Sequence, residues 1–235
     1  MNEEPLDTRI LVVVTSHDAV DEENPTGVWL EEFARPYDAF VAQGYTVEVA
    51  SPRGGVVPID PSSEPEDAGE WEAARARLGD TLRLSDVVPE EFDALYLPGG
   101  HGTMFDFPDD PELQRIVRDL AGRDRVIAAV CHGPAAFANI EDEDGRPLVE
   151  GVRLTAFTDA EERETGLQDA MPFLLESRLR ERGAEFVAEE PWSDHVEVDG
   201  AWITGQNPQS SGTVGVEIVH AIQERKAVET GTTGP

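Results

Sequence analysis

The chain has 235 residues, of which 18 are Lys or Arg and 49 are Asp or Glu, giving a net charge of −31. At this charge, nucleic acids and anionic membrane surfaces repel the protein, so we expect neither as a partner. An acid-rich surface with a single lysine, Lys226, favours a halophilic origin, and a solvated surface needed only for solubility is the alternative.

Length and segment patterns predict one domain. A chain of this size can bury one sizeable core. No apolar run approaches the roughly 20 residues that span a bilayer, and the first residues lack a secretory signal, so we expect a cytoplasmic protein. We assign residues 1–223 to the domain, with a surface insertion at about 52–85 that is rich in Pro, Gly, Ser and acids, and 224–235 to a loose tail.

Short β-branched or alternating apolar runs predict the strands. They lie at 10–14, 45–51, 92–97, 126–130, 152–156, 185–187 and 202–204. Apolar residues at helical spacing predict the helices. These lie at 26–44, 111–121, 135–138, 172–182 and 213–223, with a short one near Trp71.

Local signals define several boundaries. Thr26 is expected to cap the first helix, Pro36 to kink it, and Gly44 to end it. The acidic stretch 158–165 is expected to form a turn. Because strands alternate with helices, the fold class is α/β: a three-layer sandwich with a mainly parallel sheet and helices on both faces.

The only cysteine, Cys131, follows the buried strand 126–130 and precedes His132, Gly133 and Pro134. This pattern predicts a nucleophile elbow, in which a sharp turn presents the thiol at the start of a helix. The positive end of that helix would lower the thiol pKa from about 8.5 to between about 3.5 and 7.5. Gly133 gives the tight turn its room.

Two alternatives stay open at this turn. An unpaired cysteine is often a small buried hydrophobe, so Cys131 could simply end a strand. Adjacent side chains on a strand point to opposite faces, so His132 serves the thiol only if the turn swings its ring back.

A glycine loop follows the neighbouring predicted strand, 92–97. Its residues are Gly99, Gly100, His101 and Gly102. Such loops often only turn the chain. Beside an elbow, the loop could aim a backbone N–H at the oxyanion that forms when Cys131 attacks a carbonyl. We therefore assign Gly100, His101 and Gly133 to oxyanion and substrate binding.

At these residues the chain resembles the ThiJ/PfpI superfamily, relatives of class I glutamine amidotransferases with a flavodoxin-like fold, and within it the heat-shock, glyoxalase III-like branch. The resemblance spans about 9–223. The motifs that carry it are Thr26-Gly27-Val28-Trp29-Leu30-Glu31-Glu32, Gly100-His101-Gly102-Thr103, Ala129-Val130-Cys131-His132-Gly133-Pro134, Gly145-Arg146-Pro147-Leu148, Phe157-Thr158-Asp159 and Thr204-Gly205-Gln206-Asn207-Pro208.

The resemblance implies two acidic site residues. The helix-borne glutamate that contacts the nucleophile corresponds to Glu32, although Glu31 and Glu32 alone would both be taken as solvated helix charges. The acid that orients the histidine corresponds to Glu162, with Glu161 and Asp159 as competitors in the same acidic stretch. Together with Cys131 and His132, these acids would complete the catalytic set.

The function that the resemblance implies is conversion of methylglyoxal or a related 2-oxoaldehyde to a 2-hydroxy acid through a cysteine thiolate, without cofactor or metal. The sequence has neither a Walker loop nor a zinc-ligand spacing. The rivals are a deglycase, a peptidase-like cysteine hydrolase and, from another class, a holding chaperone. The resemblance also implies a homodimer.

Overall fold

The computed structural model describes residues 8–67, 69–229 and 231. Its centre is a seven-stranded sheet with the order β3-β2-β1-β4-β5-β9-β8. All neighbouring strands are parallel except β8 and β9, which pair antiparallel at the edge. The long parallel strands follow the flavodoxin-like order. The bounds are β1 Arg9–Val13, β2 Thr46–Ser51, β3 Leu82–Arg83, β4 Ala94–Leu97, β5 Val126–Val130, β8 Val196–Asp199 and β9 Trp202–Gly205.

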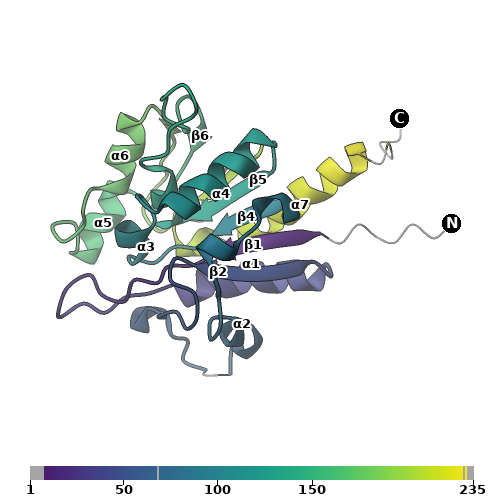
Figure 1. Ribbon diagram of the computed structural model, residues 1–235. Helices are drawn as coiled ribbons and strands as arrows, with labels where there is room; N and C mark the ends of the chain where they lie inside the picture. Colours follow the sequence, from purple (N-terminus) through teal and green to yellow (C-terminus); the bar gives the residue numbers. More distant parts are fainter. Residues whose placement is uncertain (1–7, 68, 230, 232–235) are drawn as a thin grey trace.

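Helices cover both faces of this sheet (Figure 1), which confirms the predicted α/β sandwich. Alternate residues of each strand face two different cores, because successive side chains point to opposite sides. Leu11 packs in the core beneath α4 and α6, whereas Ile10 packs in the core beneath α1 and α7. The helices are α1 Leu30–Ala42, α2 Glu72–Arg77, α3 Thr103–Asp106, α4 Pro111–Gly122, α5 Asp159–Thr165, α6 Leu175–Glu181 and α7 Ser211–Glu229.

Short elements complete the chain. A separate two-stranded parallel sheet joins β6 to β7. Its strands are β6 Arg153–Leu154 and β7 Glu185–Phe186, and the 3-10 turns are η1 Pro61–Ser63, η2 Leu84–Asp86, η3 Pro89–Glu91, η4 Gly133–Phe137 and η5 Pro208–Ser210. The segment 52–85, expected to run over the surface, also supplies the edge strand β3.

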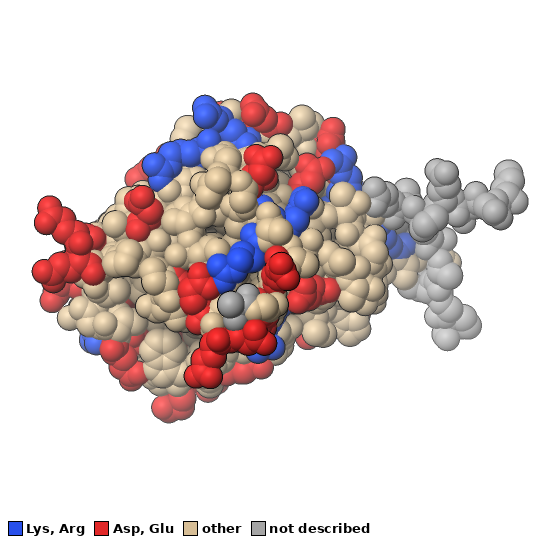
Figure 2. Space-filling model, turned by 90° about the horizontal axis from the view of Figure 1, so that it is seen from below, with Lys and Arg blue, Asp and Glu red and all other residues tan. Residues whose placement is uncertain are grey.

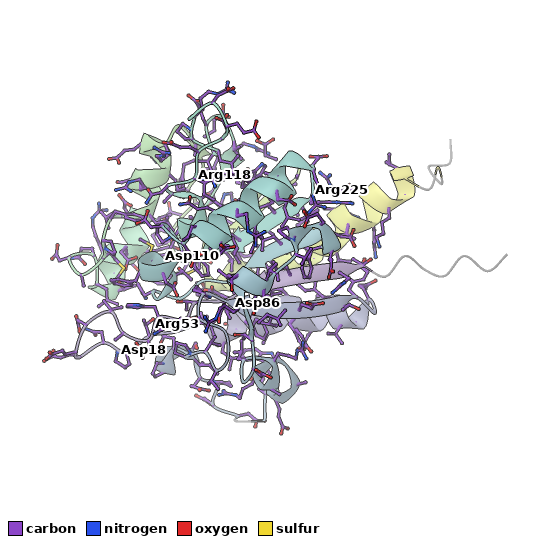
Figure 3. All side chains as sticks on the ribbon, in the orientation of Figure 1. Asp18, Arg53, Asp86, Asp110, Arg118 and Arg225 are labelled. Atoms are coloured by element: carbon purple, nitrogen blue, oxygen red, sulfur yellow. The ribbon has the colours of Figure 1, made fainter. Side chains whose placement is uncertain are left out.

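Helix caps and loop contacts show how local sequence sets these bounds. Asp110 accepts hydrogen bonds from the N–H groups of Glu112 and Leu113 and so caps α4. In the loop after β2, Arg53 donates to the carbonyl oxygen of Ser16, beyond the end of β1. Figure 3 labels Asp110 and Arg53.

Several expected boundaries were wrong. Thr26 does not cap α1: the cap residue is Trp29, and the Thr26 hydroxyl instead donates to Asp60 over 2.9 Å. α1 continues through Pro36. The last helix does not stop at 223 but runs to Glu229, and β8, which no strand pattern indicated, forms the sheet edge.

The stretch 158–165 is not a turn but helix α5. Its first residues form a capping box, in which Thr158 accepts from the N–H of Glu161 and the Glu161 carboxylate accepts from the N–H of Thr158. This box is visible in the sequence as Thr-x-x-Glu. The expected turn therefore overlooked a local helix signal.

Acidic side chains are frequent on the exterior. In the view from below they lie around the rim and across the middle of this face, with Lys and Arg side chains between them (Figure 2). Among the described residues, no helix combines the length and the apolar character needed to cross a membrane.

Candidate active site

Strand β5 delivers Cys131 into a strained turn at the carboxyl end of the sheet. The five residues of β5 are buried between β4 and β9, as expected for a central parallel strand. The next residue, Cys131, has φ of 58°, a left-handed conformation that is uncommon outside glycine. Strain of this kind persists where surrounding contacts impose it, and it clusters at functional sites. The predicted elbow is therefore present in the backbone.

The turn swings the His132 ring back to the sulfur. Sγ of Cys131 lies 3.3 Å from Nδ1 of His132, and Nε2 of His132 lies 2.6 Å from Oε2 of Glu162. Cys131 is 3% exposed, His132 1% and Glu162 4%, so the thiol lies just below the surface. The 3.3 Å distance places it beside a base. Thiol, imidazole and carboxylate form one continuous hydrogen-bonded chain.

Neighbouring acids in α5 face different partners. Only Glu162 reaches His132. The Glu161 carboxylate turns the other way, to the N–H of Trp192 at 2.8 Å. Asp159 accepts a hydrogen bond from the hydroxyl of Ser177 at 2.6 Å. The geometry thus favours Glu162 as the third member over the two competitors.

Glu32 approaches Cys131 from α1. It is fully buried, and its Oε2 accepts a 2.7 Å hydrogen bond from the N–H of Gly99. Oε1 is buried without a hydrogen-bond partner in the described part of the chain. Tyr96 holds the backbone here, because its hydroxyl donates to the Glu32 carbonyl oxygen over 2.7 Å.

Burial controls the proton balance between Glu32 and Cys131. It raises the pKa of Glu32 to about 8, although interactions with the thiol and the Gly99 N–H oppose this rise. Burial also raises the pKa of the Cys131 thiol well above its ordinary value, and the negative charge of Glu32 adds to the effect. Glu32 and Cys131 therefore favour a state in which at least one of them is protonated over a state in which both are ionised.

The expected lowering of the thiol pKa was wrong. The element after Cys131 is not an α-helix over 135–138 but η4, a five-residue 3-10 turn. A turn of this length has almost no summed dipole to stabilise a thiolate. Activation of the sulfur therefore depends on proton transfer to a neighbouring group.

The pKa values of His132 and Glu162 are both lowered, for different reasons. Burial lowers the pKa of His132, and the nearby His101 lowers it further. Burial alone would raise the pKa of Glu162, but the two histidines outweigh it and hold that pKa well below its usual range. Glu162 is therefore an ionised acceptor that can orient either imidazole.

The glycine loop packs directly against the elbow. Gly100 has φ of 105°, and a Cβ there would lie 2.1 Å from the carbonyl oxygen of Gly27. The N–H of Gly100 makes no hydrogen bond within the described residues, so it is an open donor. A Cβ on Gly133 would lie 2.1 Å from the Leu97 carbonyl oxygen, which explains glycine at that position.

The His101 side chain belongs to the same cluster. Its Nε2 lies 2.9 Å from Oε1 of Glu162, and its ring centroid is 4.3 Å from that of His132. Sequence reasoning placed His101 in the binding loop but gave no sign of the contact to Glu162. That contact exists only because α5 folds over the glycine loop.

These three side chains could also hold a metal ion. His101, His132 and Glu162 each offer one ligand atom, and those atoms lie within 4.8 Å of one another. Both Nε2 atoms already face the carboxylate at hydrogen-bond distance, so an ion would have to replace both of those contacts. Two imidazoles and a carboxylate suit zinc or a similar ion.

An aromatic layer backs the imidazoles. The ring of Phe157 lies 4.3 Å from that of His132 and 5.5 Å from that of Trp192. Phe157 is fixed beside the elbow because its N–H donates to the Cys131 carbonyl oxygen over 2.9 Å. Phe157 stands in the Phe157-Thr158-Asp159 motif of the family resemblance, but neither aromatic residue stands in a periodic pattern that would assign it to the site.

A family model described as the DJ-1/PfpI family matches residues 25–221. The chain belongs to this family. The match covers the elbow, the glycine loop, Glu32 and α5, and it confirms the resemblance to ThiJ/PfpI proteins.

The curated relatives carry glyoxalase names. Glyoxalase 3 of Candida albicans is 31% identical over 232 residues, covering 92% of this chain and 98% of the relative. The glutathione-independent glyoxalase HSP31 of Saccharomyces cerevisiae is 29% identical, with the same coverage. Among solved structures, glyoxalase III of Candida albicans matches with a TM-score of 0.84 at 31% identity, covering 91% of this chain and 97% of that chain.

Proposed function

We propose that the protein is a glutathione-independent glyoxalase that converts methylglyoxal or a related 2-oxoaldehyde to a 2-hydroxy acid. The observation that carries the proposal is the placement of Cys131 Sγ between two proton-accepting groups, the His132 imidazole at 3.3 Å and the Glu32 carboxyl group. The glyoxalase names of relatives that align with almost the whole chain support the same reaction.

In the first step the sulfur attacks the aldehyde carbon. The thiol proton passes to Nδ1 of His132 or to the Glu32 carboxylate, and the new C–S bond forms as the carbonyl π electrons move to oxygen. The oxygen then takes a proton and becomes the hydroxyl of a thiohemiacetal. Ionised Glu162 stabilises the positive charge that this places on His132.

In the second step a proton moves between adjacent carbons. A base removes the hydrogen from the former aldehyde carbon, an enediol forms, and the second carbon is then protonated. Glu32 suits this shuttle, because a carboxyl group with a pKa of about 8 both accepts and returns a proton near neutral pH. The product is a thioester of the 2-hydroxy acid.

In the third step water attacks the thioester and releases the 2-hydroxy acid, and the thiol regains its proton. The open N–H of Gly100, with the backbone N–H groups at the start of η4 beside Gly133, would hold the oxyanion. No external oxidant or reductant enters, since one carbon is oxidised while its neighbour is reduced.

The direct test is turnover of methylglyoxal by the purified protein without glutathione, at low and high salt, with lactate as the measured product. We expect turnover by the parent and none by Cys131→Ser or by parent alkylated at Cys131. A parent that alkylates at Cys131 but forms no lactate from any 2-oxoaldehyde overturns the proposal.

The same samples distinguish the rival functions. Release of free amine from glycated substrates without lactate formation would favour a deglycase or another cysteine hydrolase. Suppression of client aggregation that persists in Cys131→Ser, with no turnover by the parent, would favour a holding chaperone.

A further inference from the structure

One carboxylate serves two histidines in this site. Oε2 of Glu162 lies 2.6 Å from Nε2 of His132, and Oε1 lies 2.9 Å from Nε2 of His101. The orienting role of a triad acid needs only one of these contacts. We propose that His101 is a further catalytic residue, the acid that protonates the ketone oxygen of the 2-oxoaldehyde during enediol formation. This inference rests on the proposed glyoxalase function.

The two histidines are held as one rigid unit. The Thr103 hydroxyl is shared between the carbonyl oxygens of His132 and Gly100, each at 2.9 Å, and so ties the elbow to the glycine loop. Gly100, which adopts a positive φ of 105° that favours glycine, sets the direction in which the loop presents His101. The ring of Phe157, 6.2 Å from that of His101, packs edge-on beside it.

Exposure distinguishes the two imidazoles. The side chain of His101 is 11% exposed, against 1% for His132 and 5% for Glu162. Nδ1 of His101 makes no hydrogen bond within the described residues and is not a buried unsatisfied atom. With Nε2 fixed on Glu162, this nitrogen is the free end of the relay and is available to a bound molecule.

The other groups of the site are committed elsewhere. Nδ1 of His132 faces the sulfur. Both carboxylate oxygens of Glu162 are engaged, one with each histidine Nε2. Oε2 of Glu32 accepts the hydrogen bond of the Gly99 N–H, and the carboxyl group interacts with the Cys131 thiol. A substrate with two adjacent carbonyl groups needs a proton donor at each oxygen, and His101 is the group left for the second.

Protons and electrons balance in the conversion of the thiohemiacetal to the thioester. The base removes a proton from C1, the former aldehyde carbon of the thiohemiacetal. The electron pair of the C1–H bond forms the C1=C2 bond, where C2 is the ketone carbon. The π electrons of the C2=O bond move to that oxygen, which takes the proton of His101. When C2 is then protonated by the base, the C1 hydroxyl loses its proton to His101 as the thioester carbonyl forms. Glu162 stabilises the imidazolium before and after, as a carboxylate does for a paired imidazole.

The test separates proton donation from mere positioning. His101→Gln keeps an N–H that can donate to Glu162 but cannot deliver a proton. We expect kcat for methylglyoxal to fall by about 100-fold or more, which is the usual contribution of general acid catalysis. The rate of Cys131 alkylation by iodoacetamide, and its dependence on pH, should stay within about 3-fold of the parent, because His132 and Glu32 still face the sulfur.

A matched control removes another donor to the same oxygen. The Thr165 hydroxyl lies 3.0 Å from Oε1 of Glu162, so Thr165→Val weakens the support of that oxygen and leaves His101 in place. We expect kcat for Thr165→Val within about 5-fold of the parent. A comparable loss in both variants would show that His101 only positions Glu162.

Three outcomes overturn the assignment: turnover by His101→Gln within about 3-fold of the parent, a fall in alkylation parallel to the fall in turnover, or equal losses in His101→Gln and Thr165→Val. A parent that alkylates normally but turns over no 2-oxoaldehyde instead overturns the underlying glyoxalase function, so the two failures are distinguishable.

Discussion

Glu161 and Glu162 are adjacent in the chain, yet their carboxylates belong to separate networks. Glu162 holds the two histidines, whereas Glu161 is fully buried and accepts hydrogen bonds from three separate segments. The donors are Thr158 N and Oγ1, Trp192 N, Gln206 Nε2 and Asn207 Nδ2, at 2.8 to 3.1 Å. Successive helical residues are rotated by about 100°, which sends the two side chains in different directions.

Glu161→Gln should therefore lower stability. A glutamine has only one acceptor oxygen, so its NH₂ group must face donors on one side, and leaving buried donors unsatisfied costs about 1 to 3 kcal/mol. Denaturant unfolding followed by circular dichroism measures the change. Glu224→Gln on α7 is the control, because the Glu224 side chain is exposed and makes no hydrogen bond or ion pair within the described residues, and its expected effect is below about 0.5 kcal/mol. Equal effects in both variants would contradict the network.

Glu32→Gln should separate thiol reactivity from turnover. The negative charge of Glu32 raises the pKa of Cys131, so a neutral side chain should shift the pH dependence of iodoacetamide alkylation to lower pH. Turnover of methylglyoxal should nevertheless fall by about 100-fold or more, because the proton shuttle is lost. Retained turnover would remove Glu32 from the mechanism.

The same variant should change the dependence of stability on pH. The pKa of Glu32 is about 8 in the folded protein against an ordinary value of 4.5, so the folded state binds its proton more tightly than the unfolded state. This contribution is complete below about pH 4.5 and is lost as pH rises through 8. Glu32→Gln should flatten the decline in the free energy of unfolding over that interval.

A half-buried acid, Asp106, lies at the end of α3. Asp106 accepts from the Thr15 hydroxyl at 2.9 Å and the Ser16 N–H at 2.8 Å, and burial raises its pKa to about 6 from 3.8. Because the folded pKa is the higher one, this group stabilises the protein fully below about pH 3.8 and loses that contribution as pH rises through 6. Asp106→Asn should remove this slope from unfolding curves measured between pH 4 and pH 7. An unchanged slope would contradict the raised pKa.

Gly100→Ala should impair both folding and turnover. An alanine at φ of 105° is strained, and its Cβ would overlap the carbonyl oxygen of Gly27 at 2.1 Å. We expect a loss of at least about 2 kcal/mol and a large fall in kcat, since the loop carries His101. Gly212→Ala in α7, where nothing lies within 4 Å of the added Cβ, should be neutral or slightly stabilising. Thermal unfolding and methylglyoxal assays measure both.

Local sequence determined the scaffold. The runs that became β1, β4 and β5 are short and almost wholly apolar, as buried parallel strands are, and the run that became β2 alternates apolar and polar residues. The sequence also marked the elbow and the glycine loop, because a thiol between a buried strand and a Gly-Pro turn has few other arrangements. These features placed Cys131, His132 and the glycine loop together at the carboxyl end of the parallel strands.

Tertiary structure decided which side chains meet at the sulfur and what their proton affinities are. Glu162 contacts His132 across 30 positions of sequence and His101 across 61. Glu32 reaches Cys131 from a different helix, and Glu161 points away from the histidines although it is next to Glu162 in the chain. Burial, which raises the pKa of both Cys131 and Glu32, likewise depends on what packs around them. Periodicity reports which face of an element is apolar; only the packed fold sets distances and solvent access, and these control the chemistry.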